Sequence, residues 1–244
     1  MRSVRHFVDA PLRVGATLDL PEAAVAHLVR VLRLQAGDPV VLFNGDGCDY
    51  PARLLVAGKR GAQAEVLERI PLDNESPLPI TLVQGIARGE KMDLILQKAT
   101  ELGVARIAPV LTERTEVKLD AERAAKRMQH WRGVVLGACE QSGRARVPEL
   151  LEPQPLAAYL AGEAPGHRFL LDPLAERSIA RAGVLPGEAL ALLIGPEGGL
   201  SERDRLTARA AGFTGLRLGP RVLRTETAGL AAIAAFNAVF GDWR

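Results

Sequence analysis

The sequence is short of cysteine and of long apolar runs, and each shortage excludes a class of protein. Cys48 and Cys139 are the only cysteines in 244 residues, too few for a disulfide framework and without the spacing of a metal site. No run of eighteen apolar residues occurs, so we expect no helix that spans a membrane. The first residues also lack the apolar stretch of a signal peptide, and the expected location is the reducing cytoplasm.

The sequence also has no excess of one charge and lacks the two common phosphate-binding glycine motifs. The formal net charge of +2 gives no bulk attraction to nucleic acid, so a basic surface would have to come from clustered residues. Neither G-x-x-x-x-G-K-[ST] nor G-x-G-x-x-G is present, which leaves a nicotinamide dehydrogenase as a distant alternative. Hydrophobic residues make up 48% of the chain, enough to bury a core.

Two patterns divide the chain near a polar, proline-bounded stretch at residues 71–77. Residues 1–72 are predicted to form a small β-rich barrel domain with one helix, because short apolar runs alternate with turn signals. Its expected strands and helix are Phe7–Val8, Thr17–Leu20, Pro39–Phe43, Tyr50–Val56 and the helix Pro21–Leu34.

Residues 77–244 alternate between strand and helix patterns, which predicts an α/β domain with a mostly parallel sheet covered on both faces. The last helix is apolar nearly all round and is expected to be buried. The expected strands are Ile80–Gly85, Ile107–Leu111, Phe169–Asp172, Ala189–Ile194 and Leu216–Leu218, and the expected helices are Glu90–Leu102, Ala121–Cys139 and Thr225–Phe240.

Two glycine-proline loops in the last fifth of the chain follow expected strands. The first contains Gly195-Pro196-Glu197-Gly198-Gly199, and the second contains Gly219-Pro220. Loops of this kind bring backbone N–H and C=O groups to the carboxyl edge of a parallel sheet, where α/β folds bind ligands. An acidic side chain and no lysine in the first loop favour a purine-containing cofactor without phosphate over a phosphate ligand. Ser201 with Asp204 predicts a capping box for the next helix.

Several blocks spread over nearly the whole chain resemble the RsmE family of ribosomal RNA uridine N3-methyltransferases, in the SPOUT superfamily. Small departures occur at Ala26 and Leu200, where the family pattern has His and Phe. The blocks that carry the resemblance are His27–Leu34, Gly85–Asp93, Gln97–Gly103, Glu113–Leu119, Glu140–Pro148 and the two glycine loops.

The resemblance implies a PUA-like RNA-binding β-barrel followed by a domain whose C-terminal part forms a trefoil knot. It further implies S-adenosyl-L-methionine as methyl donor, a homodimer, and small-subunit ribosomal RNA or the assembled small subunit as substrate. The residues expected to hold the donor are Leu171, Ile194, Gly195, Pro196, Gly198, Gly199, Leu218, Gly219, Val222, Leu223, Thr225 and Ala228.

Methylation of uridine at N3 requires that the N3 proton leaves and that the base, unpaired or flipped out, faces the methyl donor. Arg224 or Arg114 is expected to orient the uracil and stabilise negative charge on its carbonyl oxygens. Glu226 or Glu140 is the candidate acceptor of the proton, while the position of Glu226 near a helix start favours a simpler role as a partner of the helix dipole.

Clustered basic residues are candidates for contact with the RNA backbone, although an ordinary solvated surface explains them as well. No metal is expected, because the histidines are isolated in sequence. A ribose 2′-O-methyltransferase of the same superfamily and a non-catalytic RNA-binding protein of the same fold remain alternatives. The candidate RNA-binding residues are Arg2, Arg5, His6, Arg30, Arg33, Arg88, Lys91 and Arg144.

Overall fold

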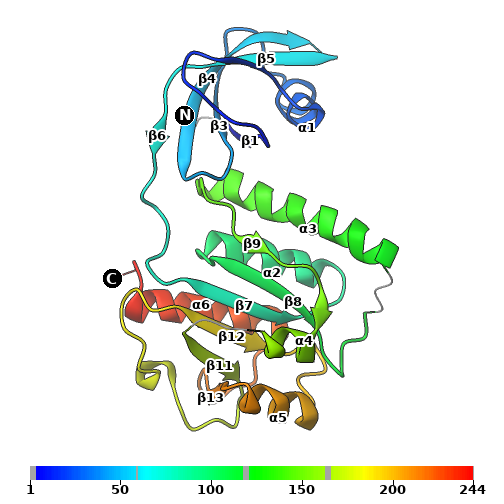
Figure 1. Cartoon of the computed structure of the whole chain (residues 1–244), viewed down its shortest axis with the longest axis vertical. Helices are drawn as coiled ribbons and strands as arrows, with labels where there is room; N and C mark the ends of the chain where they lie inside the picture. The colour runs from blue at the N-terminus through cyan, green and yellow to red at the C-terminus, as the bar shows by residue number, and fades with distance from the viewer. Residues whose placement is uncertain (1–3, 59, 118–120, 163–165, 244) are drawn as a thin grey trace. The chain divides into compact units, whose positions relative to one another are not determined.

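The computed structural model describes residues 4–58, 60–117, 121–162 and 166–243 (Figure 1). The chain divides into two compact units, each with its own sheet. The first comprises Met1–Glu75 and Cys139–Val147, and the second comprises Ser76–Ala138 and Pro148–Arg244. A segment from the middle of the chain therefore packs with the N-terminal unit, next to residues that precede it by more than a hundred positions.

The first unit is built on a mostly antiparallel sheet in the strand order β1-β3-β4-β5-β2, with β6 paired to β4. Alternate residues of β4 and β5 point into the core, where Leu28, Leu42 and Leu54 are fully buried. The strands are β1 (Arg5–Phe7), β2 (Thr17–Asp19), β3 (Pro39–Phe43), β4 (Cys48–Gly58), β5 (Gly61–Val66) and β6 (Ile70–Pro71).

The expected helix over Pro21–Leu34 begins as predicted and ends differently. Pro21 is the N-cap of α1 (Glu22–Ala24), which continues as a π-helical segment η1 (Val25–Val31). The helix pattern therefore placed Val25 and Leu28 correctly in the core, but it overestimated the length of the helix. Arg33 leaves the helix with a φ of 59°, a left-handed conformation that L residues rarely adopt.

The second unit contains a parallel sheet in the order β10-β8-β7-β12-β11-β13, with β9 also paired to β8. Because this order departs from the chain order, the chain crosses over the sheet several times. The strands are β7 (Ile80–Gly85), β8 (Arg106–Leu111), β9 (Glu149–Leu150), β10 (Gln154–Pro155), β11 (His167–Leu171), β12 (Leu190–Ile194) and β13 (Thr214–Leu216).

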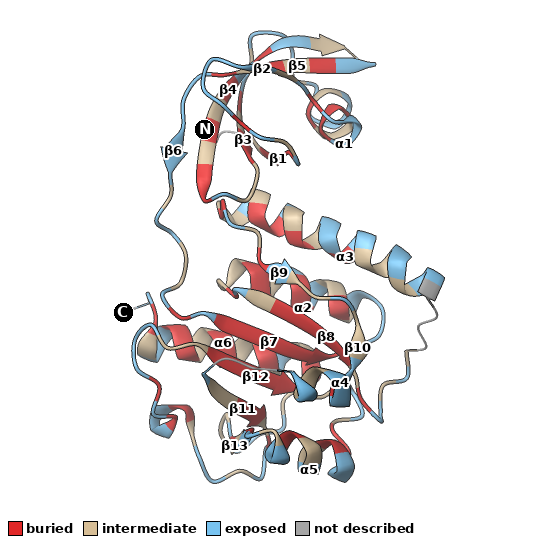
Figure 2. Ribbon diagram, viewed as in Figure 1, coloured by how far each residue is buried: buried red, intermediate tan, exposed pale blue. Residues whose placement is uncertain are grey.

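Helices cover both faces of this sheet. On one face α2 packs against α6, and Gly229 of α6 lies over Leu82 and Ile194. On the other face α4 and α5 pack over a core that includes Val83 and Leu193. Strands β7 and β12 are buried along their whole length (Figure 2). The helices are α2 (Glu90–Glu101), α3 (Ala121–Ser142), α4 (Leu156–Ala161), a 3-10 turn η2 (Ile179–Arg181), α5 (Glu202–Ala210) and α6 (Thr225–Phe240).

The predicted fold class is confirmed: a mostly parallel α/β sheet follows a small β-rich domain. The trefoil knot stays a prediction. Two expectations for the second unit need correction. Strand β13 ends at Leu216, so Leu218 lies in the following loop, and α6 is buried on one face but not all round, since Val239 is 46% exposed. None of the described helices has both the length and the apolar character needed to cross a membrane.

Candidate functional site: a cavity walled by two glycine loops

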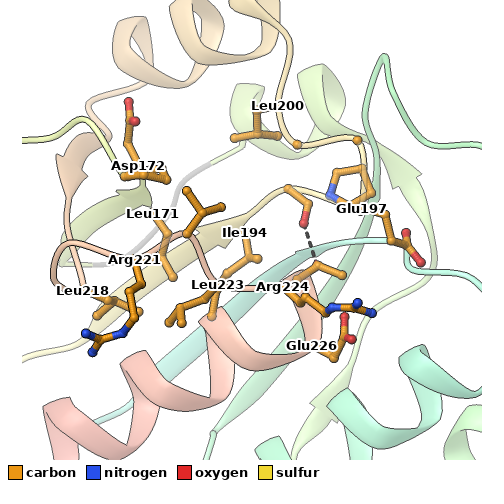
Figure 3. Close-up of a pocket in the computed structure, with 18 of the residues that line it drawn as sticks. Leu171, Asp172, Ile194, Glu197, Leu200, Leu218, Arg221, Leu223, Arg224 and Glu226 are labelled. Carbon is orange, nitrogen blue, oxygen red and sulfur yellow. Dashed lines mark hydrogen bonds between the residues drawn. The ribbon is translucent and has the colours of Figure 1, made fainter.

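A cavity of about 510 Å³ lies at the carboxyl ends of β11, β12 and β13 (Figure 3). Leu171 and Ile194 contribute its floor from the last positions of β11 and β12. Both glycine loops and the first turn of α6 form the walls. All twelve residues expected to hold a cofactor line this single cavity, although they come from three separate segments of the chain.

The glycines of the first loop are required by close packing of backbone on backbone. A Cβ at Gly195 would lie 2.8 Å from the carbonyl carbon of Gly199 and 2.8 Å from the nitrogen of Leu200. A Cβ at Gly85, at the end of β7, would lie 2.6 Å from the ring of Pro196. Since real Cβ contacts are longer than 3 Å, only glycine permits the loop to fold back onto the strand ends. The first loop is consequently packed main chain against main chain beside the cavity.

Thr225 links the first loop to the start of α6 through a side-chain hydrogen bond. Its hydroxyl donates a hydrogen bond to the carbonyl oxygen of Gly195 at 2.6 Å and accepts one from the side-chain amide of Gln84 at 2.9 Å. Gln84 is fully buried in β7, and its amide also donates to the carbonyl oxygen of Gly85. Two strand ends and one helix start are thereby held in fixed positions around the cavity.

Glu197 carries negative charge on the rim. Its carboxylate accepts hydrogen bonds from the backbone N–H of Arg88 at 3.1 Å and from Nζ of Lys91 at 3.2 Å. Partial burial alone would raise the pKa of Glu197, but hydrogen bonds from its own N–H, from Arg88 and from Lys91 lower it below the usual value. Lys91 lines the cavity, and the Arg88 side chain forms an ion pair with Glu116.

Arg224 and Glu226 begin α6 and both line the cavity (Figure 3). Arg224 is the exposed N-cap residue, and its guanidinium projects from the helix start. The Oε2 atom of Glu226 is buried and has no hydrogen-bond partner among the described residues. A buried carboxylate oxygen without a partner is costly, so this atom is poised to accept a hydrogen bond from a ligand.

Arg114 and Glu140, the alternative catalytic candidates, do not line the cavity. The guanidinium of Arg114, in the loop after β8, donates to the carbonyl oxygen of Gly198 at 3.0 Å, so it supports the first glycine loop from outside. Glu140 lies near the end of α3 within the first unit, where its carboxylate contacts His6 at 2.7 Å and accepts a hydrogen bond from the N–H of Phe7.

Several basic residues expected on an RNA-binding surface have partners within the first unit. Arg5 forms an ion pair with Asp49 at 2.5 Å, and Arg144, only 4% exposed, pairs with Glu75. Arg30, at the surface, pairs with Glu22 of α1, His6 is buried, and Arg2 lies outside the described residues. Arg33 is solvent-exposed, and no ion pair to it occurs among the described residues.

Sequence reasoning missed seven of the residues that line the cavity. Among them Asp172 is 5% exposed and forms an ion pair with Arg205 at 2.9 Å, which brings together the end of β11 and the middle of α5. The position of Asp172 at the carboxyl end of an expected strand was the signal that could have identified it. The seven are Asp172, Pro173, Glu197, Leu200, Arg205, Leu216 and Arg221.

The fold and the cavity together define a class of protein: an α/β domain that holds a small ligand in a backbone-lined pocket at its sheet edge. Comparison with protein-family models identifies both domains of the chain. The family model for the RNA methyltransferase domain matches residues 74–237, and the model for the RNA methyltransferase PUA domain matches residues 20–67.

Whole-chain relatives agree with both matches. The ribosomal RNA small subunit methyltransferase E of Neisseria gonorrhoeae, solved bound to S-adenosyl methionine, is 41% identical over all of both chains with a TM-score of 0.92. A Legionella pneumophila protein solved with bound cofactor SAM is 38% identical, covers 99% of this chain and 100% of its own, and has a TM-score of 0.95. The methyltransferase E of Synechocystis is 33% identical over 96% of this chain and 77% of its own length. This chain belongs to the ribosomal RNA small subunit methyltransferase E family.

Proposed function

We propose that this protein transfers a methyl group from S-adenosyl-L-methionine to N3 of a uridine in small-subunit ribosomal RNA. The observation that carries the proposal is the single cavity that both glycine loops line. Two relatives were solved with that cofactor, and one of them is named a ribosomal RNA small subunit methyltransferase. We propose the cytoplasm as its location, where small subunits are assembled.

The cavity fits the cofactor in size and chemistry. Its volume of about 510 Å³ lies within the roughly 300–1,000 Å³ of small-molecule sites. Main-chain groups of the two loops are suited to an adenine edge, because glycines let the chain approach the ring closely. Ile194, Leu218 and Leu223 supply apolar walls. When bound, S-adenosyl-L-methionine supplies an electrophilic methyl group on a sulfonium.

Arg224 and Glu226 are the residues we assign to the uracil. The guanidinium of Arg224 is positioned to hold a carbonyl oxygen of the base and to stabilise negative charge that develops there. The free Oε2 of Glu226 is suited to accept the N3 proton, because no other described group occupies it. Arg114 is then a positioning residue, which keeps the first loop in place through Gly198.

We further propose that the first unit binds RNA and that two copies of the chain form a dimer. A match to an RNA methyltransferase PUA domain over residues 20–67 supports the first point, with Arg33 as the candidate phosphate contact there and Arg88 and Lys91 as candidates near the cavity. An apolar stripe on the outer face of α6 supports the second point, since residues 231, 234, 235 and 238 are alanines that remain partly or fully exposed.

The test is methylation in vitro with purified protein, labelled S-adenosyl-L-methionine, and either naked small-subunit RNA or assembled subunits lacking the modification. Digestion to nucleosides and mass spectrometry should find the label in N3-methyluridine. Label on a ribose 2′ oxygen would contradict the proposal in favour of ribose methylation. No transfer to either substrate, with cofactor binding intact, would favour an RNA-binding protein without catalysis.

Replacement of Arg224 by Ala tests the assignment of the uracil contact. We expect turnover to be abolished while binding of S-adenosyl-L-methionine, measured by calorimetry, is mostly retained, since the donor is held chiefly by main chain. Near-normal turnover would remove Arg224 from the mechanism. Arg203→Ala, on the exposed surface of α5, serves as the matched control, and its turnover should equal that of the unaltered protein.

A further inference from the structure

Two histidines and a carboxylate converge in the first unit, and none of the three lines the cavity. His6 comes from β1, His27 from the π-helical segment η1, and Glu140 from the end of α3. One ligand atom of each residue lies within 4.8 Å of the other two. All three belong to the same compact unit, so their arrangement depends on the packing of that unit alone.

The distances between these atoms match those between ligands that share one metal ion. Nδ1 of His6 lies 2.7 Å from Oε1 of Glu140 and 3.3 Å from Nδ1 of His27, and Nδ1 of His27 lies 3.9 Å from Oε2 of Glu140. An ion bound tetrahedrally with bonds of about 2.0–2.1 Å has donor atoms about 3.4 Å apart. The three observed separations bracket that value.

The orientation of the two rings is difficult to explain by hydrogen bonds alone. His6 and His27 are nearly perpendicular, at 74°, and each directs Nδ1 toward the other. A neutral imidazole has one donor and one acceptor nitrogen, so an Nδ1–H of His6 that is donated to Glu140 leaves Nδ1 of His27 without a well-placed partner at 3.3 Å. A single cation satisfies all three lone pairs at once. The backbone N–H of Phe7 holds Oε1 of Glu140 at 3.1 Å, as partners of metal ligands commonly do.

The burial of the three side chains and their access to solvent are also typical of a metal site. The side chains of His6 and Glu140 are 10% and 15% exposed, which fixes their positions, whereas His27 is 39% exposed and leaves one side open to solvent. An ion could enter on that side and complete its coordination with water. The segment that carries His27 is a π-helix, an irregularity frequent at functional sites.

We propose that His6, His27 and Glu140 bind one divalent ion of the zinc class. Two neutral imidazoles and one carboxylate are the ligands that Zn²⁺ takes in proteins, whereas Mg²⁺ and Ca²⁺ prefer oxygen alone. The ion joins the first strand, the helix and the segment Cys139–Val147, which are distant in sequence, and so stabilises the first unit. The inference does not depend on the methyl-transfer reaction.

The test uses untagged full-length protein treated with a chelator and exchanged into metal-free buffer. Titration with ZnCl₂ by calorimetry should give one equivalent bound, and CoCl₂ should give the visible absorption of a four-coordinate site. His27→Gln should weaken Zn²⁺ binding by about a hundredfold or more, at least as much as loss of a partner of a metal ligand. Zinc should raise the melting temperature of the unaltered protein and leave that of His27→Gln unchanged.

His167→Gln is the matched control, because His167 also contacts a carboxylate, Glu188 at 2.7 Å, but without a second histidine. This variant should bind zinc as the unaltered protein does. Glu140→Gln is a second test of the ligand set, scored only after circular dichroism shows it folded. Absence of zinc and cobalt binding at micromolar concentration, or equal affinity in His27→Gln and the unaltered protein, would overturn the proposal.

Discussion

The cavity of the second unit and the histidine cluster of the first are built in opposite ways. Two loops wall the cavity, and in the first of them Gly195 allows backbone to contact backbone. The cluster consists of the side chains of His6, His27 and Glu140, each supplied by a different segment. Main-chain geometry is set by the fold itself, whereas a side-chain cluster depends on the identity of each member. A substitution that adds atoms to a glycine should therefore weaken ligand binding in the cavity most. A substitution that removes a ligating group should weaken ion binding in the cluster most.

The largest effect on the cavity should come from a single added methyl group, Gly195→Ala. Its Cβ would lie 2.8 Å from backbone atoms of Gly199 and Leu200, which cannot rotate away. Overpacking of this kind costs roughly 1–3 kcal/mol, and we expect the affinity for S-adenosyl-L-methionine, measured by calorimetry, to fall about tenfold to a hundredfold.

Gly133→Ala is the control for this substitution. Gly133 lies in α3 with nothing within 4 Å of its Cβ position, and alanine is favoured over glycine in a helix by about 0.5–1 kcal/mol. Cofactor affinity should not change in this variant. If Gly195→Ala bound S-adenosyl-L-methionine as tightly as the unaltered protein, the loop would have room for the methyl group. The cavity would then not depend on close backbone packing, and the contrast with the histidine cluster would be lost.

A smaller effect should follow from Thr225→Val, which keeps the shape and removes the hydroxyl. The carbonyl oxygen of Gly195 and the amide of Gln84 would each lose a buried hydrogen bond, at a cost of about 1–3 kcal/mol in the free energy of unfolding. Urea denaturation measures this loss. Thr225→Ser retains the hydroxyl and should lie close to the unaltered protein; an equal loss in both variants would assign the effect to packing.

Ser201→Ala should have a smaller effect again, because it removes one half of a capping box. The Ser201 hydroxyl accepts from the N–H of Asp204 at 3.0 Å, and the Asp204 carboxylate accepts from the N–H of Ser201 at 3.1 Å. Loss of an N-cap typically costs about 1 kcal/mol, measurable as a lower melting temperature. Ser201→Thr should restore most of it. An unchanged melting temperature in Ser201→Ala would show that α5 is held by packing alone.

The smallest effect should come from the rim of the cavity, where Glu197 is partly exposed. Its pKa lies below the ordinary 4.5 in the folded protein, so its contribution to stability is present above about pH 4.5 and is lost as the pH falls through the folded pKa. The difference in unfolding free energy between the unaltered protein and Glu197→Gln should therefore shrink on acidification. A difference that grows toward acid pH would contradict the direction of the shift.

The contrast between the two sites also explains what could be predicted from sequence. The residues that line the cavity could be predicted because each glycine loop is continuous in the chain and follows an apolar strand, so local pattern places it at the sheet edge. Strands β7 and β3 and helix α6 matched their expected ranges, because each is also a continuous segment whose local pattern defines it.

Features with a weak local pattern, or that depend on contacts between segments distant in sequence, could not be predicted. Strand β5 was missed because its buried positions at residues 62 and 64 are alanines, which give a weak alternation. The pairing of Asp172 with Arg205 and the convergence of His27 on Glu140 depend on which segments the fold brings together. The π-helical segment η1 was predicted as ordinary helix, because the spacing of Val25, Leu28 and Val29 follows the α-helical period.

The most direct test of methyl transfer is mass spectrometry of small-subunit ribosomal RNA from cells that lack this protein. The account predicts that one N3-methyluridine disappears, returns with the unaltered gene, and does not return with Arg224→Ala. An RNA that keeps all its N3-methyluridine, or that loses a different methylated nucleoside, would contradict the account.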